Sequence, residues 1–125
     1  MRVSYLTTDE VNRDLALQLA EACGVTLQPL TPRDLPQDGP GDAVLYDLDF
    51  LPAAHRQEVL AALAAGAMSC PAGVHSYSLD GAVAAALRKQ TVVVSARLDR
   101  RLIQNLRRLA ARRERQSMNK AAVTH

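Results

Sequence analysis

Polar side chains come directly after several apolar runs of this sequence, at positions where strands are expected to end. Asp47 closes the apolar run 42–47, Ser76 lies near the end of a weaker run, and Asp9 follows the first run. Carboxylates gathered at strand ends can hold a hard cation such as Mg²⁺ through their oxygen atoms. An aspartate that leaves a strand is also a common turn former and helix cap, so the residue types alone leave both interpretations open.

Short apolar runs alternate along the chain with segments of helical periodicity, and this order predicts the fold. Aspartate or proline, which suit the first turn of a helix, stand where the helices should begin. We expect strands over 3–6, 25–30, 42–47, 73–77 and 91–95. We expect helices that begin after a cap at Asp9 or Thr8, at Pro52, after Asp80 and near Asp99. The alternation is typical of an α/β, flavodoxin-like three-layer sandwich with a five-stranded parallel sheet in the order 2-1-3-4-5. Ligands of this fold bind at the carboxyl ends of the strands.

One segment departs from the alternation. Residues 31–41 contain three prolines and two glycines, so they can hold one helical turn but no long helix. We therefore expect the second helix of the fold to be shortened or replaced by a Pro-rich loop. We place one domain over 1–116 and expect a disordered tail over 117–125, where no periodic apolar pattern continues.

The composition is that of a globular protein, with 48% hydrophobic and 22% charged residues. Two cysteines without metal-site spacing indicate free thiols in a reducing compartment. The first residues do not form a signal peptide, and no apolar run is long enough to cross a membrane. We therefore expect a cytoplasmic protein that makes no membrane contact.

The net charge of +2 conceals an acidic body and a basic last helix. Residues 97–120 carry nine basic and two acidic side chains, a net charge of +7. The first 96 residues carry six basic and eleven acidic ones, a net charge of −5. Apolar side chains recur on one side of the last helix and basic ones on the other. The basic residues that we single out as a binding surface are Arg100, Arg101, Arg107, Arg108 and Arg112.

This basic face has three interpretations. In the first, it is a solvated outer face, as on many amphipathic helices. In the second, it is a protein interface, because arginine is enriched in interfaces and binds carboxylates in a two-pronged geometry. In the third, it binds the phosphate backbone of nucleic acid, an interpretation that the acidic body and the lack of a recognised DNA-binding motif disfavour.

The order of the motifs resembles a known family. The run Asp42-Ala43-Val44-Leu45-Tyr46-Asp47, followed by Pro52, resembles the third strand of receiver domains of two-component response regulators, although the proline lies one residue later than usual. The segment that opens with Asn12-Arg13-Asp14-Leu15 and closes with Glu21-Ala22-Cys23-Gly24 is similar to the first receiver helix. Val92 to Leu109 match the closing strand and helix in hydrophobic pattern. The resemblance covers residues 2–113, nearly the whole chain.

The resemblance implies roles for five positions. Asp47 falls at the phosphoaccepting aspartate, and Ser76 at the hydroxyl that senses the phosphoryl group. Thr7 and Thr8 fall where receivers have two acids that hold Mg²⁺, and Ala96 falls where they have a lysine that pairs with the phosphoryl oxygens. Two of the four functions are therefore kept and two are lost, which implies a degenerate receiver, or pseudo-receiver.

We expect a signalling domain that is not an enzyme, needs no cofactor and acts by protein–protein interaction. Its expected partner is a kinase or an output protein, and a homodimer through the last strand and helix is a second option. One alternative is a working phosphoacceptor in a phosphorelay, with Mg²⁺ held by Asp9 and Asp47 and with Ser76 as the switch. The other alternative is that the basic last helix binds nucleic acid.

Overall fold

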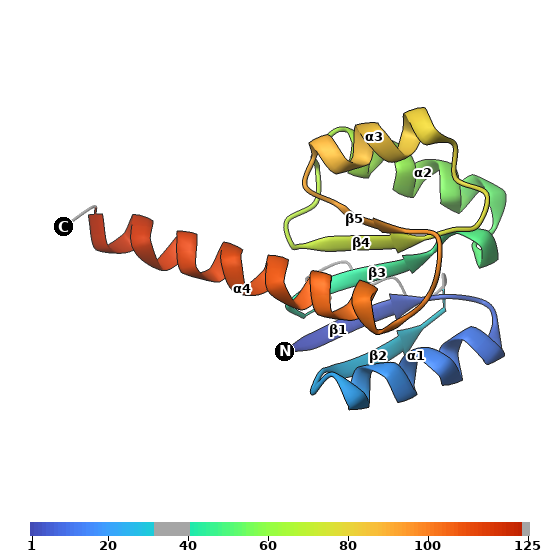
Figure 1. The fold of residues 1–125 in the computed structure, drawn as a ribbon. Coiled ribbons are helices and arrows are strands. Elements are labelled where there is room, and N and C mark those ends of the chain that lie inside the picture. The colour runs from blue at the N-terminus through green and yellow to red at the C-terminus, as the bar shows by residue number, and fades with distance from the viewer. Residues whose placement is uncertain (32–40, 124–125) are drawn as a thin grey trace.

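The computed structural model describes residues 1–31 and 41–123. The strands in these ranges are β1 (Arg2–Leu6), β2 (Thr26–Leu30), β3 (Ala43–Asp47), β4 (Ala72–His75) and β5 (Val93–Ser95). The helices are α1 (Glu10–Ala22), α2 (Ala53–Ala64), α3 (Gly81–Lys89) and α4 (Arg100–Val123) (Figure 1). A 3₁₀ turn, η2 (Leu48–Phe50), follows β3 and was not predicted.

The strands form one parallel sheet in the predicted order, β2-β1-β3-β4-β5. The chain runs outward from β1 to β2 and then crosses back to β3, so β1 and β3 are neighbours at the point where the strand order reverses. Every residue of β3 is buried, as expected for a strand covered on both faces. The carboxyl ends of β1, β3 and β4 therefore meet at one edge of the sheet.

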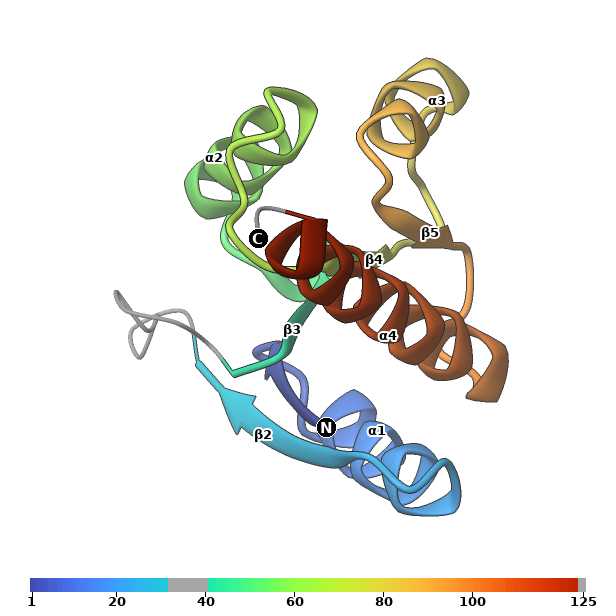
Figure 2. The ribbon, with the colours of Figure 1, turned by 90° about the vertical axis from the view of Figure 1, so that its left-hand side faces the viewer.

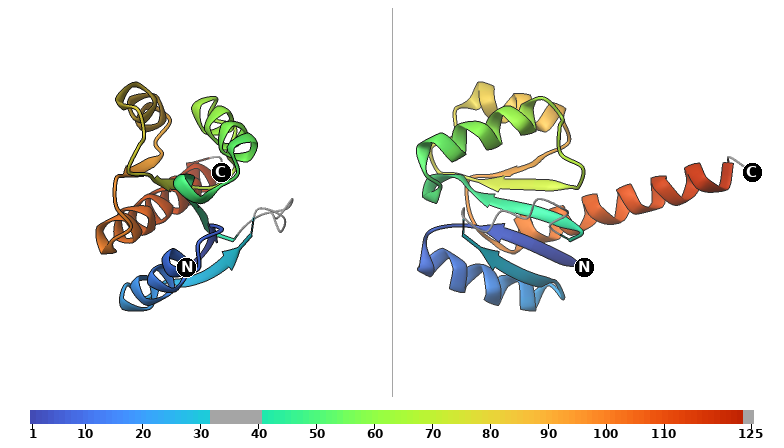
Figure 3. Two further views of the ribbon diagram at one scale, coloured as in Figure 1. Left: turned by 90° about the vertical axis from the view of Figure 1, so that its right-hand side faces the viewer. Right: turned by 180° about the vertical axis from the view of Figure 1, so that it is seen from behind.

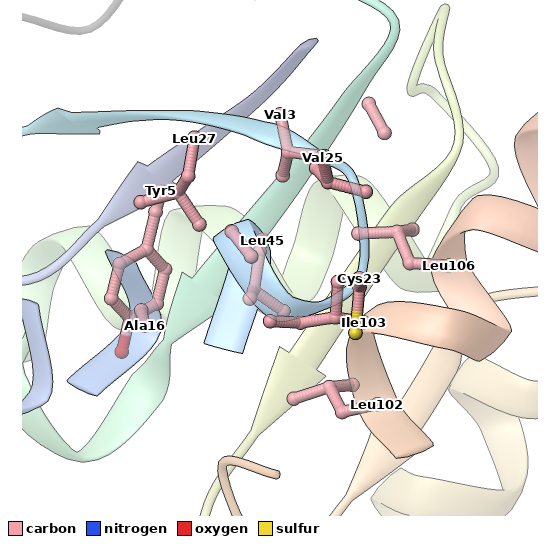
Figure 4. Close-up of a cluster of buried hydrophobic side chains, with 12 residues drawn as sticks. Val3, Tyr5, Ala16, Cys23, Val25, Leu27, Leu45, Leu102, Ile103 and Leu106 are labelled. Carbon is pink, nitrogen blue, oxygen red and sulfur yellow. The ribbon is translucent and has the colours of Figure 1, made fainter. Parts of the chain in front are cut away.

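Helices cover both faces of the sheet: α1 and α4 lie on one face, and α2 and α3 on the other (Figure 2). Figure 4 shows the core under α1 and α4, where Tyr5, Leu45 and Leu106 are among the buried side chains. Gly73 of β4 lies close to Leu45 in this core. A Cβ at Gly73 would lie 3.2 Å from Leu45 Cδ1, so Leu45 would have to shift slightly, whereas both terminal carbons of Leu106, at 3.6 Å, would be in ordinary van der Waals contact.

Aspartates begin three of the helices: Asp80 is the predicted cap of α3, Asp9 is one of the two candidates for α1, and Asp99 lies at the predicted start of α4. The carboxylates of Asp9, Asp80 and Asp99 accept hydrogen bonds of 2.9, 2.7 and 3.0 Å from backbone N–H groups in the first turns of α1, α3 and α4. Those N–H groups have no partner within their helices, so the caps stabilise the helix starts. Gly24, just after α1, has a φ of 68°, which glycine adopts without strain.

The last helix, α4, extends well beyond the sheet (Figures 1 and 3). Its first part is held by four buried side chains, Leu102, Ile103, Leu106 and Leu109. The helix continues to Val123 although no apolar stripe continues in its sequence. Alanine, lysine, glutamine and methionine have a high intrinsic helix propensity, which favours this continuation. It thus passes the domain boundary that we place at residue 116, and that boundary stays a prediction.

Two further expectations concern the connections. The predicted loss of the second helix falls on residues 32–40, which lie outside the described residues. The strand predicted over 91–95 is shorter, because Thr91 has a φ of 62° and belongs to the turn after α3. Among the helices of the described ranges, none is both long enough and apolar enough to span a membrane.

Candidate functional site

Strand alternation brings four polar residues together at the carboxyl edge of the sheet. Tyr5 and Thr7 are two residues apart, so they point to the same face, the one that α1 and α4 cover. Asp47 pairs with His75 of the neighbouring strand in the sheet register. Hydrogen bonds join these two strand ends to Tyr5 and Thr7, and all four residues are buried.

Asp47 is the centre of this group and has no exposed surface. Its Oδ2 accepts hydrogen bonds of 2.9 Å from Thr7 Oγ1 and from Asn12 Nδ2, and the Tyr5 hydroxyl lies 3.4 Å away. Within the described residues its Oδ1 has no hydrogen-bond partner, and it lies 3.8 Å from Nδ1 of His75. A phosphoryl donor therefore finds no accessible carboxylate oxygen in this conformation.

His75 and Tyr5 complete the buried group. The Tyr5 hydroxyl lies 2.7 Å from His75 Nε2 and 3.4 Å from Asp47 Oδ2, and the imidazole tautomer decides which of Tyr5 and His75 donates in the shorter contact. Burial lowers the pKa of His75, and the charges of Asp47 and Asp49 oppose this shift without reversing it. Burial also raises the pKa of the Tyr5 phenol, and the charge of Asp47 adds to that rise. Both rings are therefore neutral near pH 7.

Asp49, two residues after Asp47, points to a different set of partners. Its Oδ1 accepts hydrogen bonds from Ser76 Oγ at 2.6 Å and from Ser78 Oγ at 3.2 Å, and its Oδ2 accepts one from the Tyr77 backbone N–H at 2.8 Å. Burial acts to raise the pKa of Asp49, but these hydrogen bonds and a nearby arginine outweigh it and lower the pKa. These hydrogen bonds hold the loop between β4 and α3 against η2.

The structure separates Asp47 from Ser76, although both lie at the same edge. Ser76 follows directly after His75, and consecutive residues at a strand end point to opposite sides. His75 therefore faces Asp47, while the Ser76 hydroxyl turns toward Asp49.

At two of the three degenerate positions, Thr7 and Thr8, the side chains form hydrogen bonds within the carboxyl edge of the sheet. The Thr7 hydroxyl, besides its bond to the buried carboxylate, accepts the backbone N–H of Asp9 at 3.0 Å. Thr8 Oγ1 donates to the Phe50 carbonyl at 2.6 Å and ties the β1–α1 loop to η2. Ala96 is exposed just after β5.

The two carboxylates of the alternative metal site both bind Asn12. Asp9 Oδ2 accepts its backbone N–H, and Asp47 Oδ2 accepts its side-chain amide, each at 2.9 Å. In the part of the chain that the structure describes, no group of three or more histidine, cysteine, aspartate or glutamate side chains is gathered closely enough to hold a metal ion.

The basic face singled out on the last helix lies on α4, and all five of its arginines are exposed. Arg107 also has a structural contact, because its Nη1 donates to the Cys23 carbonyl at 2.8 Å and ties α4 to the end of α1. Gln104, Arg107, Arg108 and Ala111 border a hollow of about 350 Å³ on this face.

Sequence reasoning did not assign Tyr5, Asn12 or His75 to the site, although they surround Asp47. Tyr5 and His75 could have been assigned from the alternation of side-chain direction along β1 and β4, which places them on the same face of the sheet as Asp47. Asn12 lies three residues after the helix cap Asp9, and this spacing places it in the turn of α1 nearest the strand ends.

Comparisons with known proteins bear on the fold. No family model matches the sequence, and no curated protein matches it. A fusion protein that contains residues 181–211 of the trimeric coiled coil of yeast Spc42 is similar in structure, with a TM-score of 0.69, 11% identity, and coverage of 94% of this chain and 83% of that chain.

Two receiver structures are also similar. A signal receiver domain of a two-component histidine kinase from Clostridium thermocellum has a TM-score of 0.63 and 14% identity, over 87% of this chain and 95% of that chain. A response regulator receiver protein from Pseudoalteromonas atlantica has a TM-score of 0.58 and 14% identity, over 97% of this chain and 99% of that chain. With its five parallel strands in the order 2-1-3-4-5, this chain therefore has the receiver fold.

Proposed function

We propose that this domain acts in signalling by binding another protein, and that phosphorylation of Asp47 is weak or absent. The complete burial of Asp47 is the observation that carries the proposal. The domain is then a pseudo-receiver: a binding module and not an enzyme. A working phosphoacceptor that uses Mg²⁺ in a phosphorelay is the rival function.

Charge balance at the carboxyl edge supports this proposal. Phosphoryl transfer needs positive charge to neutralise the transferring oxygens, which a metal ion and a cationic side chain usually supply. Thr7 and Thr8 are neutral and hold Mg²⁺ less well than carboxylates do. Ala96 brings no cation. An incoming phosphoryl group would therefore be poorly stabilised.

Asp49 supports the first half of the proposal, because its contacts favour a binding surface that does not depend on phosphorylation. The resemblance to receivers gives Ser76 the task of sensing a phosphoryl group. Here the Ser76 hydroxyl already donates to Asp49 at 2.6 Å, and the Tyr77 N–H binds the same carboxylate. The loop that leads into α3 is thus held by a permanent negative charge, which favours one constant arrangement of the surface around it.

The basic face of α4 is the contact surface that fits a protein partner best. Arginine binds carboxylates through paired hydrogen bonds, and the basic charge of this segment contrasts with the acidic body. We propose an acidic surface on a kinase or output protein as the partner. A homodimer through β5 and α4 is the second arrangement that this face allows.

The phosphoacceptor question can be tested with beryllofluoride, which mimics a phosphoryl group. We expect ¹H–¹⁵N spectra of the protein with Mg²⁺ and beryllofluoride to change no more than those of the Asp47→Asn variant. Saturable, Mg²⁺-dependent shifts around residues 47–49 that the variant lacks would establish the rival function.

The binding surface can be tested by photo-crosslinking in the cells that make the protein. A photoreactive residue at the exposed Gln104 of α4 should give a protein adduct, and one at the exposed Glu58 of α2 should not. The adduct should persist in Asp47→Asn and disappear when Arg108 and Arg112 are both replaced by glutamine. Equal adducts from both positions would contradict the proposed surface, and a nuclease-sensitive adduct would favour nucleic acid.

A further inference from the structure

Half of the large hydrophobic residues that are exposed in the described part of the chain lie on one helix, α1. Val11 is 73% exposed, and Leu15 and Leu17 are 39% and 38% exposed. Exposed apolar residues that are scattered singly over a surface are ordinary, but a group of them on one helix marks a contact surface. The outward side of α1 is therefore a candidate for such a contact.

Acidic side chains run beside these apolar ones. Two neighbouring stripes of exposed residues follow α1, each at spacings of four, three and four residues. One stripe is Glu10, Asp14, Leu17 and Glu21, and the other is Val11, Leu15, Gln18 and Ala22. Asp14 has an ion pair with Arg13 at 3.3 Å. Within the described ranges, no ion pair engages Glu10 or Glu21. Two of the negative charges that border the apolar side chains are therefore unpaired there.

The basic face of α4 has the opposite charge and a matching shape. Its hollow of about 350 Å³ is bordered by Gln104, Arg107, Arg108 and Ala111. These residues stand at positions i, i+3, i+4 and i+7, the arrangement of four residues that receives one side chain of a facing helix when two helices pack. Alanine is small and the stem of an arginine is apolar, so the hollow suits an aliphatic side chain.

The spacing of the charges also matches between the two helices. Glu10 and Glu21 are eleven residues apart, and so are Arg101 and Arg112. Eleven residues are about three turns of an α-helix, so both members of each set lie on one side of their helix. Two ion pairs can therefore form at once, on either side of the hollow.

We propose that α1 of one copy of this chain packs on α4 of a second copy. A leucine of α1 enters the hollow, and Glu10 and Glu21 pair with arginines of the basic face. Helices α1 and α4 cover the same face of the sheet, so each copy presents both halves of the contact on one side (Figure 2). A surface that carries both halves is self-complementary, which is what a symmetric dimer requires.

This inference goes beyond the proposed function and does not rest on it, because self-association is measured on the purified chain alone. The second copy would cover the basic face of α4. Self-association and the binding of an acidic partner protein would therefore exclude each other.

Sedimentation equilibrium of the purified full chain tests the proposal. At low salt the mean mass should rise from the monomer value of 13.5 kDa towards twice that value as the protein concentration increases from micromolar to millimolar. Added salt should weaken the association, because it screens exposed charges. A constant monomer mass over this range would overturn the proposal and would leave the proposed partner of α4 untouched.

A charge exchange between the two helices tests which surfaces meet. Glu10→Arg combined with Glu21→Arg should weaken self-association by about tenfold or more, because attractive pairs become repulsive. Arg101→Glu combined with Arg112→Glu should do the same. An equimolar mixture of the two double variants should associate again, because the basic α1 of one then meets the acidic α4 of the other. A mixture that associates no more tightly than either variant alone would overturn the proposal.

Two further variants separate the proposed contact from general attraction between charges. Leu15→Gln combined with Leu17→Gln changes no charge and should weaken self-association by about tenfold, because apolar area leaves the contact. Glu58→Arg reverses an exposed acid on α2, on the opposite face of the sheet, and should change it by less than about twofold. Equal weakening by Glu58→Arg and by the reversal of the α1 acids would contradict the proposed surface.

Discussion

Asp47 and Asp49 lie two residues apart at one edge of the sheet, yet their surroundings are opposite. Asp47 has no exposed surface and is bound by the hydroxyl of Thr7, just after β1, and by the amide of Asn12 in α1. Asp49 is partly exposed and is bound by the loop that follows β4. One carboxylate holds the interior of the strand ends together, and the other holds a surface loop.

The difference arises from the backbone and not from the residue type. Asp47 is the last residue of β3, so the pleat directs it to the same face as Leu45, the one under α1 and α4. The η2 turn follows at once and directs Asp49 to the other side. A carboxylate in the interior needs fixed donors because it has lost its water, whereas one at the surface keeps part of its hydration while it binds a loop. The same chemical group therefore makes different contributions to stability.

Replacing Asp47 by alanine should have the largest effect at this edge. Thr7 and Asn12 would lose their shared acceptor, and a buried donor without a partner costs about 1–3 kcal/mol. We expect the free energy of unfolding in urea to fall by about 3 kcal/mol with an unchanged m-value. Asp47→Asn keeps an acceptor oxygen and should lose less. Equal losses in the two variants would show that the charge and not the acceptor matters.

Asp49→Ala should cost less, about 1 kcal/mol, because the donors on its loop can bind water instead. The same urea titration measures this loss, and hydrogen exchange of the Tyr77 amide should become faster in the variant. A loss as large as that of Asp47→Ala would remove the distinction between the two carboxylates.

The free energy of unfolding should also depend on the two environments in different pH ranges, through His75 beside Asp47 and through Asp49 itself. Burial lowers the pKa of His75 in the folded state below its usual value of 6.5, so the unfolded chain binds more protons below that pH. The free energy of unfolding should therefore fall as the pH drops below 6.5, by at most about 1.4 kcal/mol per pH unit, until the folded-state pKa is passed. Urea titrations between pH 7 and pH 5 should show this decline in the wild type and a flatter curve in His75→Gln.

The stabilising contribution of Asp49 should be lost only at more acidic pH. Its pKa is lowered in the folded state from 3.8, so its contribution is complete above that value and is lost as the pH falls further. Asp49→Asn should therefore leave the decline that begins near pH 6.5 unchanged. If Asp49→Asn removed that decline and His75→Gln kept it, the assignment of the two ranges would be wrong.

The smallest effect is expected for the Tyr77 side chain. Asp49 binds the Tyr77 backbone N–H, and the residue as a whole is 76% exposed. Tyr77→Ala should change the free energy of unfolding by less than about 0.5 kcal/mol, while Ser76→Ala should cost about 1 kcal/mol because it removes a hydroxyl donor to Asp49. Thermal unfolding of the two variants side by side would reveal any larger role for the ring.

The sequence by itself determined the order of the elements and the topology of the sheet. Apolar runs alternate with amphipathic segments, and the aspartates before α1, α3 and α4 satisfy N–H groups only a few residues away. Signals of this kind are local, so they can be read from neighbouring residues. The position of Asp47 at the end of a buried strand followed from the same signals.

Only the tertiary structure decided which side chains meet at the strand ends. That Asp47 binds Thr7 and Asn12, and that Ser76 binds Asp49, depends on a 3₁₀ turn without a clear sequence pattern and on contacts between residues 27 to 40 positions apart. Such contacts arise from the packing of whole elements, because the pleat sets the direction of each side chain and the packing selects its partner.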